Sequence, residues 1–478
     1  MIKRLQDNIR TSKAVRWTVL LCLAIPMFGS YFFDDMFSMV SQIFNNPKLL
    51  ELNWNSADYG YYGGAYSSLG VFGGLIICGM LLDKWGVRFT GTLFVTLMVC
   101  GSMIVTYALS PAFPGSVVAG FVGNMLGFEK PSLATAYAGC ALFGLGSEIA
   151  GVSVTKSIAK WFKGKEMALA MGLQLALARL GTAIALLLAP MVIVAKQNTP
   201  IPLTESNNMS EIGMFLMIIG FVTWFVFIAF DKKSDKQADD KSNNSDDEKF
   251  QFSDIWKILT NKHFILISLL CVFFYCCVNS FKRFAAAILE PRFGEVDISL
   301  FGVEFQTSSI MAVLLPVFTI VFTPLFGSTI DNKGKATKWL MVGSVIVLCA
   351  HLIIAFAPQI QLFGFAGLSL LGIGYSLVPA AMWPSVTKII PESKLGTAYS
   401  LIFWIQNIGL MLVPVAIGEI FALSESSHTD PKEQLTVAVY AELVFIALAC
   451  IAIAISFVLK KSSQEHPELK LDEPNKEG

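Results

Sequence analysis

Residues 79–88 read GMLLDKWGVR, a short charged turn between two long apolar runs. The runs cover residues 59–83 and 88–109, and each holds the roughly 20 apolar residues that a helix needs to cross a bilayer. A related turn, GSTIDNKGKATK in residues 327–338, also joins two apolar runs. The sequence therefore predicts the same membrane-spanning hairpin twice, which indicates an internal duplication.

The duplication extends beyond these turns. Asp83 and Asp331 stand at matching places, 248 positions apart, and further along the offset becomes 228, where residues 144–146 (GLG) match residues 372–374 (GIG). A loop in the first half, around residues 115–130, has almost no counterpart in the second and explains the missing positions. Two repeats of parallel topology are one of the architectures found in membrane transporters.

The composition agrees with a membrane protein. Of 478 residues, 54% are hydrophobic and 15% are charged, and the mean hydropathy is +0.62, which is too apolar for an ordinary soluble chain. We expect an all-α membrane protein whose twelve transmembrane helices form two pseudo-symmetric six-helix halves. The twelve apolar segments lie near residues 15–40, 59–83, 88–109, 131–160, 165–194, 211–230, 262–289, 304–330, 337–357, 360–389, 394–422 and 434–460.

A charge-rich stretch with few apolar residues separates the sixth segment from the seventh and indicates a solvated linker. The expected divisions are an N-terminal half (1–230), the linker (231–261), a C-terminal half (262–460) and a tail (461–478). Lysine and arginine gather in the loops on one side, which the positive-inside rule assigns to the cytoplasm together with both termini and the linker. Neither tail shows a clear acidic dileucine signal, so we expect a bacterial inner membrane, or a lysosomal membrane if the source is eukaryotic.

The turn in residues 79–88 resembles the loop signature G-x-L-x-D-[KR]-x-G-x-[KR] of the major facilitator superfamily, and the resemblance covers nearly the whole chain. A second stretch, WPSVTKIIPESKLGTAYSLIFWIQNIGL in residues 383–410, is similar to the branch of lysosomal dipeptide transporters and their bacterial relatives. The superfamily resemblance implies a major facilitator fold and secondary transport by alternating access. The branch resemblance implies a dipeptide substrate.

Two of the charges inside apolar segments lie near mid-membrane, Glu148 in LFGLGSEIAGVSV and Arg179 in LALARLGTA. Counted from Lys160 and Lys165 at the helix ends, they lie about 18 and 21 Å into the membrane at 1.5 Å per residue. A lone charge at such depth costs at least about 2.5 kcal/mol, so each should face a partner or a wet cavity. Two interpretations stay open at this point: an ion pair that fastens the two helices, or a pair that receives a zwitterionic substrate.

The chemistry of the two side chains suits a zwitterion. The planar guanidinium of Arg179 can grip a carboxylate with two parallel hydrogen bonds, and Glu148 can accept hydrogen bonds from an ammonium group. In the resembling branch, a glutamate and an arginine at these places hold the amino and carboxyl ends of a dipeptide. The resemblance therefore implies these roles for Glu148 and Arg179.

Four further residues are candidates for the same site. Under the 228 offset Arg179 matches Asn407, which predicts that this amide faces the substrate from the second half. Gln406 is adjacent but points about 100° away around a helix. Trp383 precedes Pro384 at an expected kink, and Tyr66 lies on the second segment; core packing is about as good an explanation for Trp383 and a better one for Tyr66.

A second group of residues predicts conformational roles. Under the 248 offset, Asp34 and Asp35 match Lys282 and Arg283, opposite charges at equivalent places, which suggests pairs that close the outer side; free solvation is the alternative. Other residues of the repeated turns should shape or hold the cytoplasmic side, through a cap, a tight turn or a charge. They are Asp83, Lys84, Gly86, Arg88 and Asp331.

Several classes of function are disfavoured. A formal net charge of +0 does not indicate nucleic acid, and the nine cysteines all fall in apolar runs, where they suit neither a metal site nor disulfides. No loop supplies a clustered nucleophile, base or metal site, so we expect no enzyme activity and no cofactor. The expected partners are a small-molecule substrate and the bilayer. Uniport is preferred; proton coupling and an organic anion or other small-metabolite substrate remain alternatives.

Overall fold

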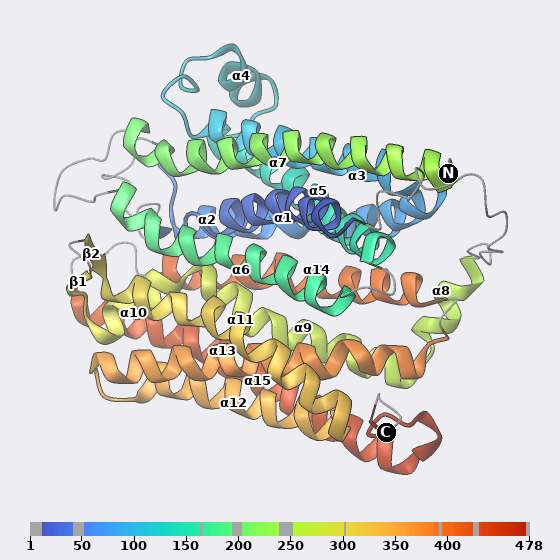
Figure 1. Ribbon diagram of the computed structural model, residues 1–478. Coiled ribbons are helices and arrows are strands. Elements are labelled where there is room, and N and C mark those ends of the chain that lie inside the picture. The colour runs from blue at the N-terminus through green and yellow to red at the C-terminus, as the bar shows by residue number, and fades with distance from the viewer. Residues whose placement is uncertain are drawn as a thin grey trace.

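The computed structural model is built almost entirely of helices (Figure 1). It describes residues 12–41, 52–162, 166–193, 203–238, 252–300, 303–391, 394–423 and 430–474. The elements are α1 (Lys13–Asp35), α2 (Ser56–Leu69), η3 (Gly70–Gly74), α3 (Leu75–Ala108), α4 (Val117–Gly120), η4 (Phe121–Met125), α5 (Pro131–Phe162), α6 (Met167–Val192), α7 (Leu203–Ala238), α8 (Phe252–Leu259), α9 (Lys262–Arg283), α10 (Ala285–Phe293), β1 (Asp297–Leu300), β2 (Val303–Gln306), α11 (Thr307–Lys333), α12 (Ala336–Phe356), α13 (Gln361–Ile389), α14 (Leu395–Ala422), α15 (Pro431–Glu465) and η7 (Pro467–Leu469).

The expected all-α membrane class is confirmed. Eleven helices in the described part of the chain are long and apolar enough to cross a membrane. The remaining expected segment, residues 59–83, is α2, η3 and the first turns of α3. Within this segment the glycine-rich stretch GVFGG forms a π-helical break in which Gly73 has φ +96°. Gly86, with φ +74°, then ends the second segment where the turn was expected.

The two halves of the sequence occupy separate parts of the bundle (Figure 1). In this view α1, α2, α3, α5 and α7 lie above α9 to α13 and α15, with α6 and α14 between them, and α2 packs along α14 while α6 packs along α11. The start of α1, the helix α8 and the end of α15 gather at one end, which we call the terminal end; the opposite end is the distal end. The two halves therefore meet along two helix pairs.

Glycines bring α2 and α14 into backbone contact. A Cβ atom on Gly64 would lie 2.4 Å from the carbonyl oxygen of Met411, and one on Gly60 would lie 2.6 Å from that of Pro414. Both distances are too short for any side chain, so only glycine allows this approach. The contact joins the halves near the distal end.

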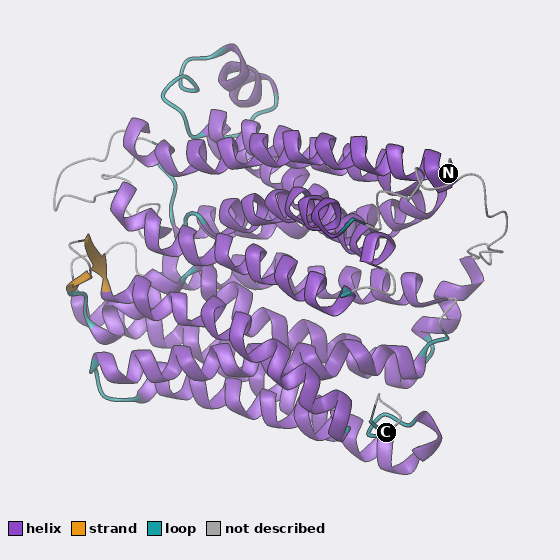
Figure 2. Ribbon diagram, in the orientation of Figure 1, coloured by secondary structure: helices purple, strands orange, loops and turns teal. Residues whose placement is uncertain are grey.

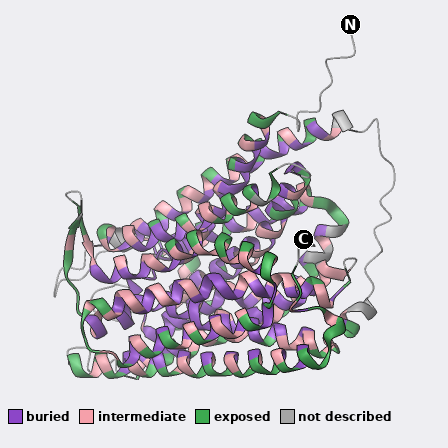
Figure 3. Ribbon diagram, turned by 60° about the horizontal axis from the view of Figure 1, so that its bottom comes forward, coloured by how far each residue is buried: buried purple, intermediate pink, exposed green. Residues whose placement is uncertain are grey.

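The surface of the bundle is apolar where lipid would cover it. Exposed residues line the outer faces of the helices while buried ones face inward (Figure 3); Phe215 and Val222 on α7 are among the exposed apolar side chains. The described strands are β1 and β2, an antiparallel hairpin at the distal end (Figure 2). The expected divisions at 230 and 261 remain predictions; α7 continues to Ala238, and α8 lies inside the expected linker.

Candidate functional site

Glu148 lies near the middle of α5, where close helix packing places it beside α2. A Cβ atom on Gly144, one turn away, would lie only 1.9 Å from the backbone oxygen of Tyr66, so the absence of a side chain there lets α5 touch α2. The Tyr66 hydroxyl donates to Ser147 (3.0 Å) and lies beside the Glu148 carboxylate. Ser147 in turn shares a 2.6 Å hydrogen bond with Ser30 of α1. Tyr66, the weakest of the expected candidates, is thus a neighbour of Glu148.

Arg179 of α6 is held by aromatic rings from both halves. Its guanidinium carbon lies 5.4 Å from the ring centre of Tyr31 on α1 and 4.9 Å from that of Tyr375 on α13. It also donates to the Tyr375 hydroxyl (3.2 Å), and that hydroxyl donates to Asn279 on α9 (3.2 Å). Aromatic faces attract the cation, yet they carry no opposite charge.

Among the described residues, no nitrogen of Arg179 lies within 4.0 Å of a Glu148 carboxylate oxygen, so the two do not form an ion pair. The first interpretation above, a pair that fastens α5 to α6, is therefore wrong for this structure. Both charges act on Tyr31, which lies within electrostatic reach of each. Opposite charges from neighbouring helices are thus held apart, with a tyrosine near both.

The structure places the other three candidates at different distances from this group. Trp383 packs against Tyr399 and Phe403, with ring centres 5.7 and 5.2 Å apart, and a hydrogen bond links it to Tyr275. The Tyr275 ring meets that of Tyr375 at 5.7 Å, so Trp383 joins the Arg179 group through one intermediate ring.

The two amides of α14 point elsewhere. The Gln406 side chain accepts from the thiol of Cys271 on α9 (3.1 Å). Asn407 is fully buried, donates to the backbone of Phe403 one turn back (2.9 Å), and lies against Gly70 at the break in α2. Its side-chain oxygen has no hydrogen-bond partner among the described residues. Asn407 thus faces the first half, as the offset suggests. It contacts the break that follows α2, however, and not the group of residues around Arg179.

The four charges at the distal end pair across the two halves, with the partners exchanged relative to the 248 offset. Lys282 contacts Asp35 (2.7 Å) and Arg283 contacts Asp34 (2.5 Å). Asp35 also accepts from Thr182 on α6 (2.7 Å) and is almost wholly buried. Each acid thus contacts the residue that matches the other acid, which is the exchange expected around a two-fold axis. The alternative, that one or both pairs simply sit in the outer water, does not fit these contacts and the burial of Asp35, Lys282 and Arg283.

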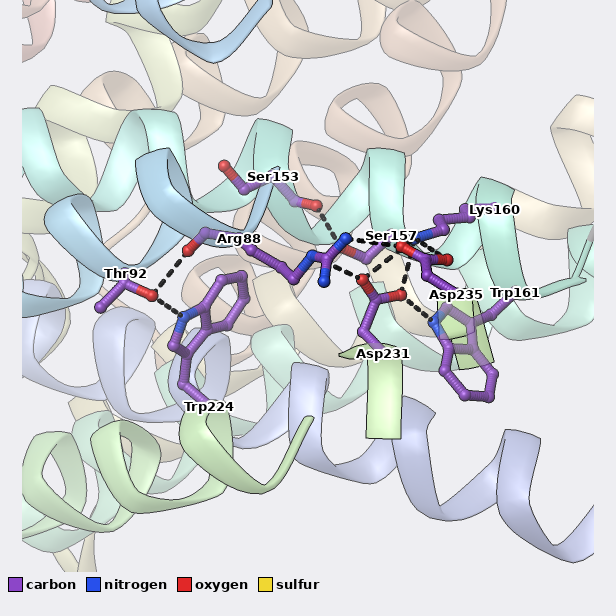
Figure 4. A network of polar contacts seen from close by, with 9 residues as sticks. All are labelled: Arg88, Thr92, Ser153, Ser157, Lys160, Trp161, Trp224, Asp231 and Asp235. Atoms are coloured by element: carbon purple, nitrogen blue, oxygen red, sulfur yellow. Dashed lines mark hydrogen bonds and ion pairs between the residues drawn. The ribbon is translucent and has the colours of Figure 1, made fainter. Parts of the chain in front are cut away.

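The repeated turn of the first half is part of an ionic network at the terminal end (Figure 4). Arg88 contacts Asp231 (3.3 Å) and Asp235 (2.6 Å), and Lys160 contacts the same two carboxylates (2.9 and 3.0 Å). Trp161 donates its indole N–H to Asp231 (2.9 Å). The sequence analysis placed both aspartates in the solvated linker. A charged extension of a helix has the same amino-acid composition as a solvated linker, so composition could not distinguish the two.

The remaining residues of the turns differ in what they contact. The Asp83 side chain lies outside the described residues, Lys84 is exposed, and Gly86 has the positive φ expected of a tight turn. Asp331 lies within electrostatic reach of Lys388. These positions agree with a structural place at the terminal end, while their conformational roles stay predictions.

The repeated turn of the second half is covered by the C-terminal segment. The backbone oxygen of Asp472 accepts from Lys335 (2.8 Å), and its carboxylate accepts from the backbone N–H (2.8 Å) and hydroxyl (2.7 Å) of Thr337 at the start of α12. Lys388 donates to the backbone oxygen of Glu473 (2.7 Å), and Leu471 is almost wholly buried. The tail after α15 therefore forms a clamp, which we define as residues 471–473.

Sequence reasoning missed the tyrosines around Arg179, although the repeat carried a signal for them. Under the 228 offset Tyr375 matches Ser147, the neighbour of Glu148, and under the 248 offset Asn279 matches Tyr31. All four positions therefore belong to equivalent faces of the two halves. No local sequence pattern marks these residues, and without the offset they do not stand out.

A bundle of two pseudo-equivalent six-helix halves with central charges of opposite sign defines the class of two-fold related membrane carriers. The profile of the Major Facilitator Superfamily matches residues 27–414 and 277–477. The chain belongs to the Major Facilitator Superfamily, and it is therefore a membrane transporter and not an enzyme.

Curated relatives and solved structures agree with this family. The chain is 27% identical over 452 residues to the zebrafish (Danio rerio) lysosomal dipeptide transporter MFSD1, covering 92% of this chain and 85% of the relative. It is 26% identical over 423 residues to the human protein of that name, covering 85% and 80%. A bacterial homolog of the human lysosomal transporter Spinster has the same fold, with a TM-score of 0.64, 15% identity, and coverage of 95% and 98%.

Proposed function

We propose that this secondary transporter moves small zwitterions, above all dipeptides, and that Glu148 holds the ammonium group and Arg179 the carboxylate. The observation that carries the proposal is that these two charges, on neighbouring helices, form no ion pair with each other among the described residues, while both act on Tyr31. Two extended residues span at most about 7 Å, so the termini of a dipeptide can reach two groups that are held apart. A substrate of this kind would neutralise both charges at once.

The neighbours of the two charges support a polar substrate with an apolar side chain. Tyr31, Tyr275, Tyr375 and Trp383 surround the positive end with rings. Such rings accept varied side chains through apolar contact while their polar atoms keep hydrogen bonds. The curated relatives in zebrafish and human are described as dipeptide transporters, which favours the same substrate class here.

The proposed cycle is alternating access by uniport, with the terminal end in the cytoplasm. Basic residues gather at the terminal end, among them Lys84, Arg88, Lys160 and Lys388, as the positive-inside rule requires of a cytoplasmic side. The Asp35–Lys282 and Asp34–Arg283 pairs would close the distal end while the substrate site opens toward the terminal end. We place the chain in a bacterial inner membrane on the absence of a clear lysosomal sorting signal.

The test is a thermal-shift titration of purified protein with dipeptides, single amino acids and dicarboxylates. A ligand that binds only the folded state raises the melting temperature by mass action. We expect dipeptides to stabilise the protein, and Glu148→Gln and Arg179→Lys to remove that stabilisation, because the first removes the charge and the second removes the planar fork. Lys432→Gln, an exposed position at the start of α15, is the matched control and should respond as the wild type does.

Other outcomes separate the alternatives. Stabilisation by dicarboxylates that survives Glu148→Gln would show an organic anion carrier. Stabilisation by dipeptides that persists in both variants would show that the zwitterion binds elsewhere. Uptake into proteoliposomes that acidifies their lumen in proportion to dipeptide entry would replace uniport by proton coupling.

A further inference from the structure

The loop between α3 and α5 is an ordered hairpin that stands out from the side of the bundle. We call residues 110–130 the lateral hairpin. Figure 1 shows α4 standing out from the side of the bundle, within the length of α7 rather than beyond the distal end, and the base of this loop packs on α5. The loop leaves the spanning helix α3 at Ala108 and returns to the spanning helix α5 at Pro131. Both of its ends therefore start where membrane helices end.

Two contacts fix the base of the lateral hairpin to the protein. Phe113 is almost wholly buried, and its ring meets that of Tyr107 on α3 at 5.5 Å. At the other side Lys130 forms an ion pair with Asp58 of α2. The hairpin is therefore held at both ends by packing and charge.

The tip keeps its shape through its own backbone. Ser116 caps α4 by accepting from the backbone N–H of Ala119 (3.1 Å), and Leu126 and Phe128 donate back into the helical turn (3.1 and 3.2 Å). Backbone groups paired in this way can enter an apolar environment at little cost. The tip thus meets the first requirement for contact with lipid.

The side chains of the tip are apolar and exposed. Residues 110–128 contain no charged residue. Val117 is 90% exposed and Met125 is 75% exposed, and the other large exposed apolar residues of this stretch are Val118, Phe121, Leu126 and Phe128. A patch of this kind on a rigid segment marks a contact with an apolar partner.

We infer that the lateral hairpin inserts its apolar tip into the lipid at the distal surface of the membrane and anchors the first half there. Lipid fits better than a protein partner for two reasons on the structure. The hairpin stands out from the side of the bundle within the length of α7, whose outer face carries exposed apolar side chains, and the first charge after the tip is Glu129, where the chain returns to the bundle. Short helical segments with a large apolar face bind membrane interfaces in this way.

The test uses single-cysteine additions, Val117→Cys and Met125→Cys at the tip and Glu129→Cys as the matched exposed control. The protein is placed singly in lipid nanodiscs, which excludes a second copy, and labelled with a sulfonated maleimide or with an uncharged lipophilic one. All native cysteines fall in apolar runs of the chain, and peptide mass spectrometry separates them from the added thiols. We expect the charged reagent to react with the tip thiols at least about tenfold more slowly than with the thiol of Glu129→Cys. The reason is that the charged reagent must leave water to reach a thiol in lipid.

Each outcome decides the inference. Slow labelling by the charged reagent with fast labelling by the lipophilic one supports lipid insertion. Fast labelling of the tip by the charged reagent in nanodiscs overturns it. Protection of the tip thiols from both reagents also overturns the inference, and it would show that a protein segment covers the tip. Fast reaction with the charged reagent in nanodiscs, combined with protection in native membranes, would show that a partner protein of the native membrane covers the tip. Labelling of the unfolded protein confirms that each added thiol is reactive.

Discussion

Arg179 carries a positive charge into the middle of the bundle, and its described neighbours offer rings instead of a carboxylate. Cation–π contacts offset only part of the cost of such a charge. The distal pairs differ, because there every charge has an opposite charge beside it. At the scale of residues, the central site is electrostatically incomplete while the distal contacts are complete.

The distal pairs make a sharp prediction about charge reversal. Lys282→Glu places two acids together in a buried site, and breaking a buried pair costs about 3 to 5 kcal/mol. We expect a large drop in melting temperature and a more open distal end. The double variant Asp35→Lys with Lys282→Glu should recover part of both, because the opposite charges meet again, although the Thr182 hydrogen bond to Asp35 is lost.

Melting curves measure the stability, and the accessibility of a thiol introduced at Tyr59, beside Arg283, measures the opening. The gate role fails if Lys282→Glu leaves that accessibility unchanged while the thiol is reactive in the unfolded protein.

At the scale of helices, the sequence predicted most of the architecture because apolar runs of about 20 residues have few alternatives in a membrane. The repeat offset predicted the helical hairpins around the two charged turns. It also predicted that charges of opposite sign meet at the distal end. The break at Gly70–Gly74 did not follow, because glycine is frequent in membrane helices that remain regular. The tyrosines of the site were missed because only the repeat offset, and no local pattern around Arg179, points to them.

Replacing glycine by alanine should destabilise the protein at the contact between α2 and α14, and should not do so at an open position on α6. Gly64→Ala drives a Cβ into the Met411 carbonyl oxygen, and such overpacking costs about 1 to 3 kcal/mol. Gly172→Ala on α6 meets open space and should be neutral or stabilising by up to about 1 kcal/mol, since alanine is the better helix former. Melting temperatures of the two variants check this, and equal shifts would show that the α2–α14 approach is looser than described.

At the scale of the whole molecule, the two halves hold their repeated turns by different means. In the first half Arg88 is held by carboxylates on α7, and in the second the clamp caps α12 through Asp472. In both halves a carboxylate from the last membrane helix, or from just beyond it, binds the chain directly after the repeated turn. The two halves therefore use the same kind of contact with different residues.

The clamp predicts a stabilising role for one side chain of the tail. Asp472→Ala removes the cap of α12, which typically costs about 1 kcal/mol, and should lower the melting temperature. Glu473→Ala is the matched control, since Glu473 contacts Lys388 through its backbone oxygen and its side chain is exposed. If both variants melt alike, the tail rests on the bundle without capping it.

The distal charges also govern which halves can assemble. Asp34 and Asp35 belong to the first repeat, and Lys282 and Arg283 to the second. Two copies of the first half docked in the same way would bring four carboxylates together, and two copies of the second would bring four cations together; both arrangements repel. Because the two repeats carry opposite charges at these four positions, each half pairs favourably with the other half and unfavourably with a second copy of itself.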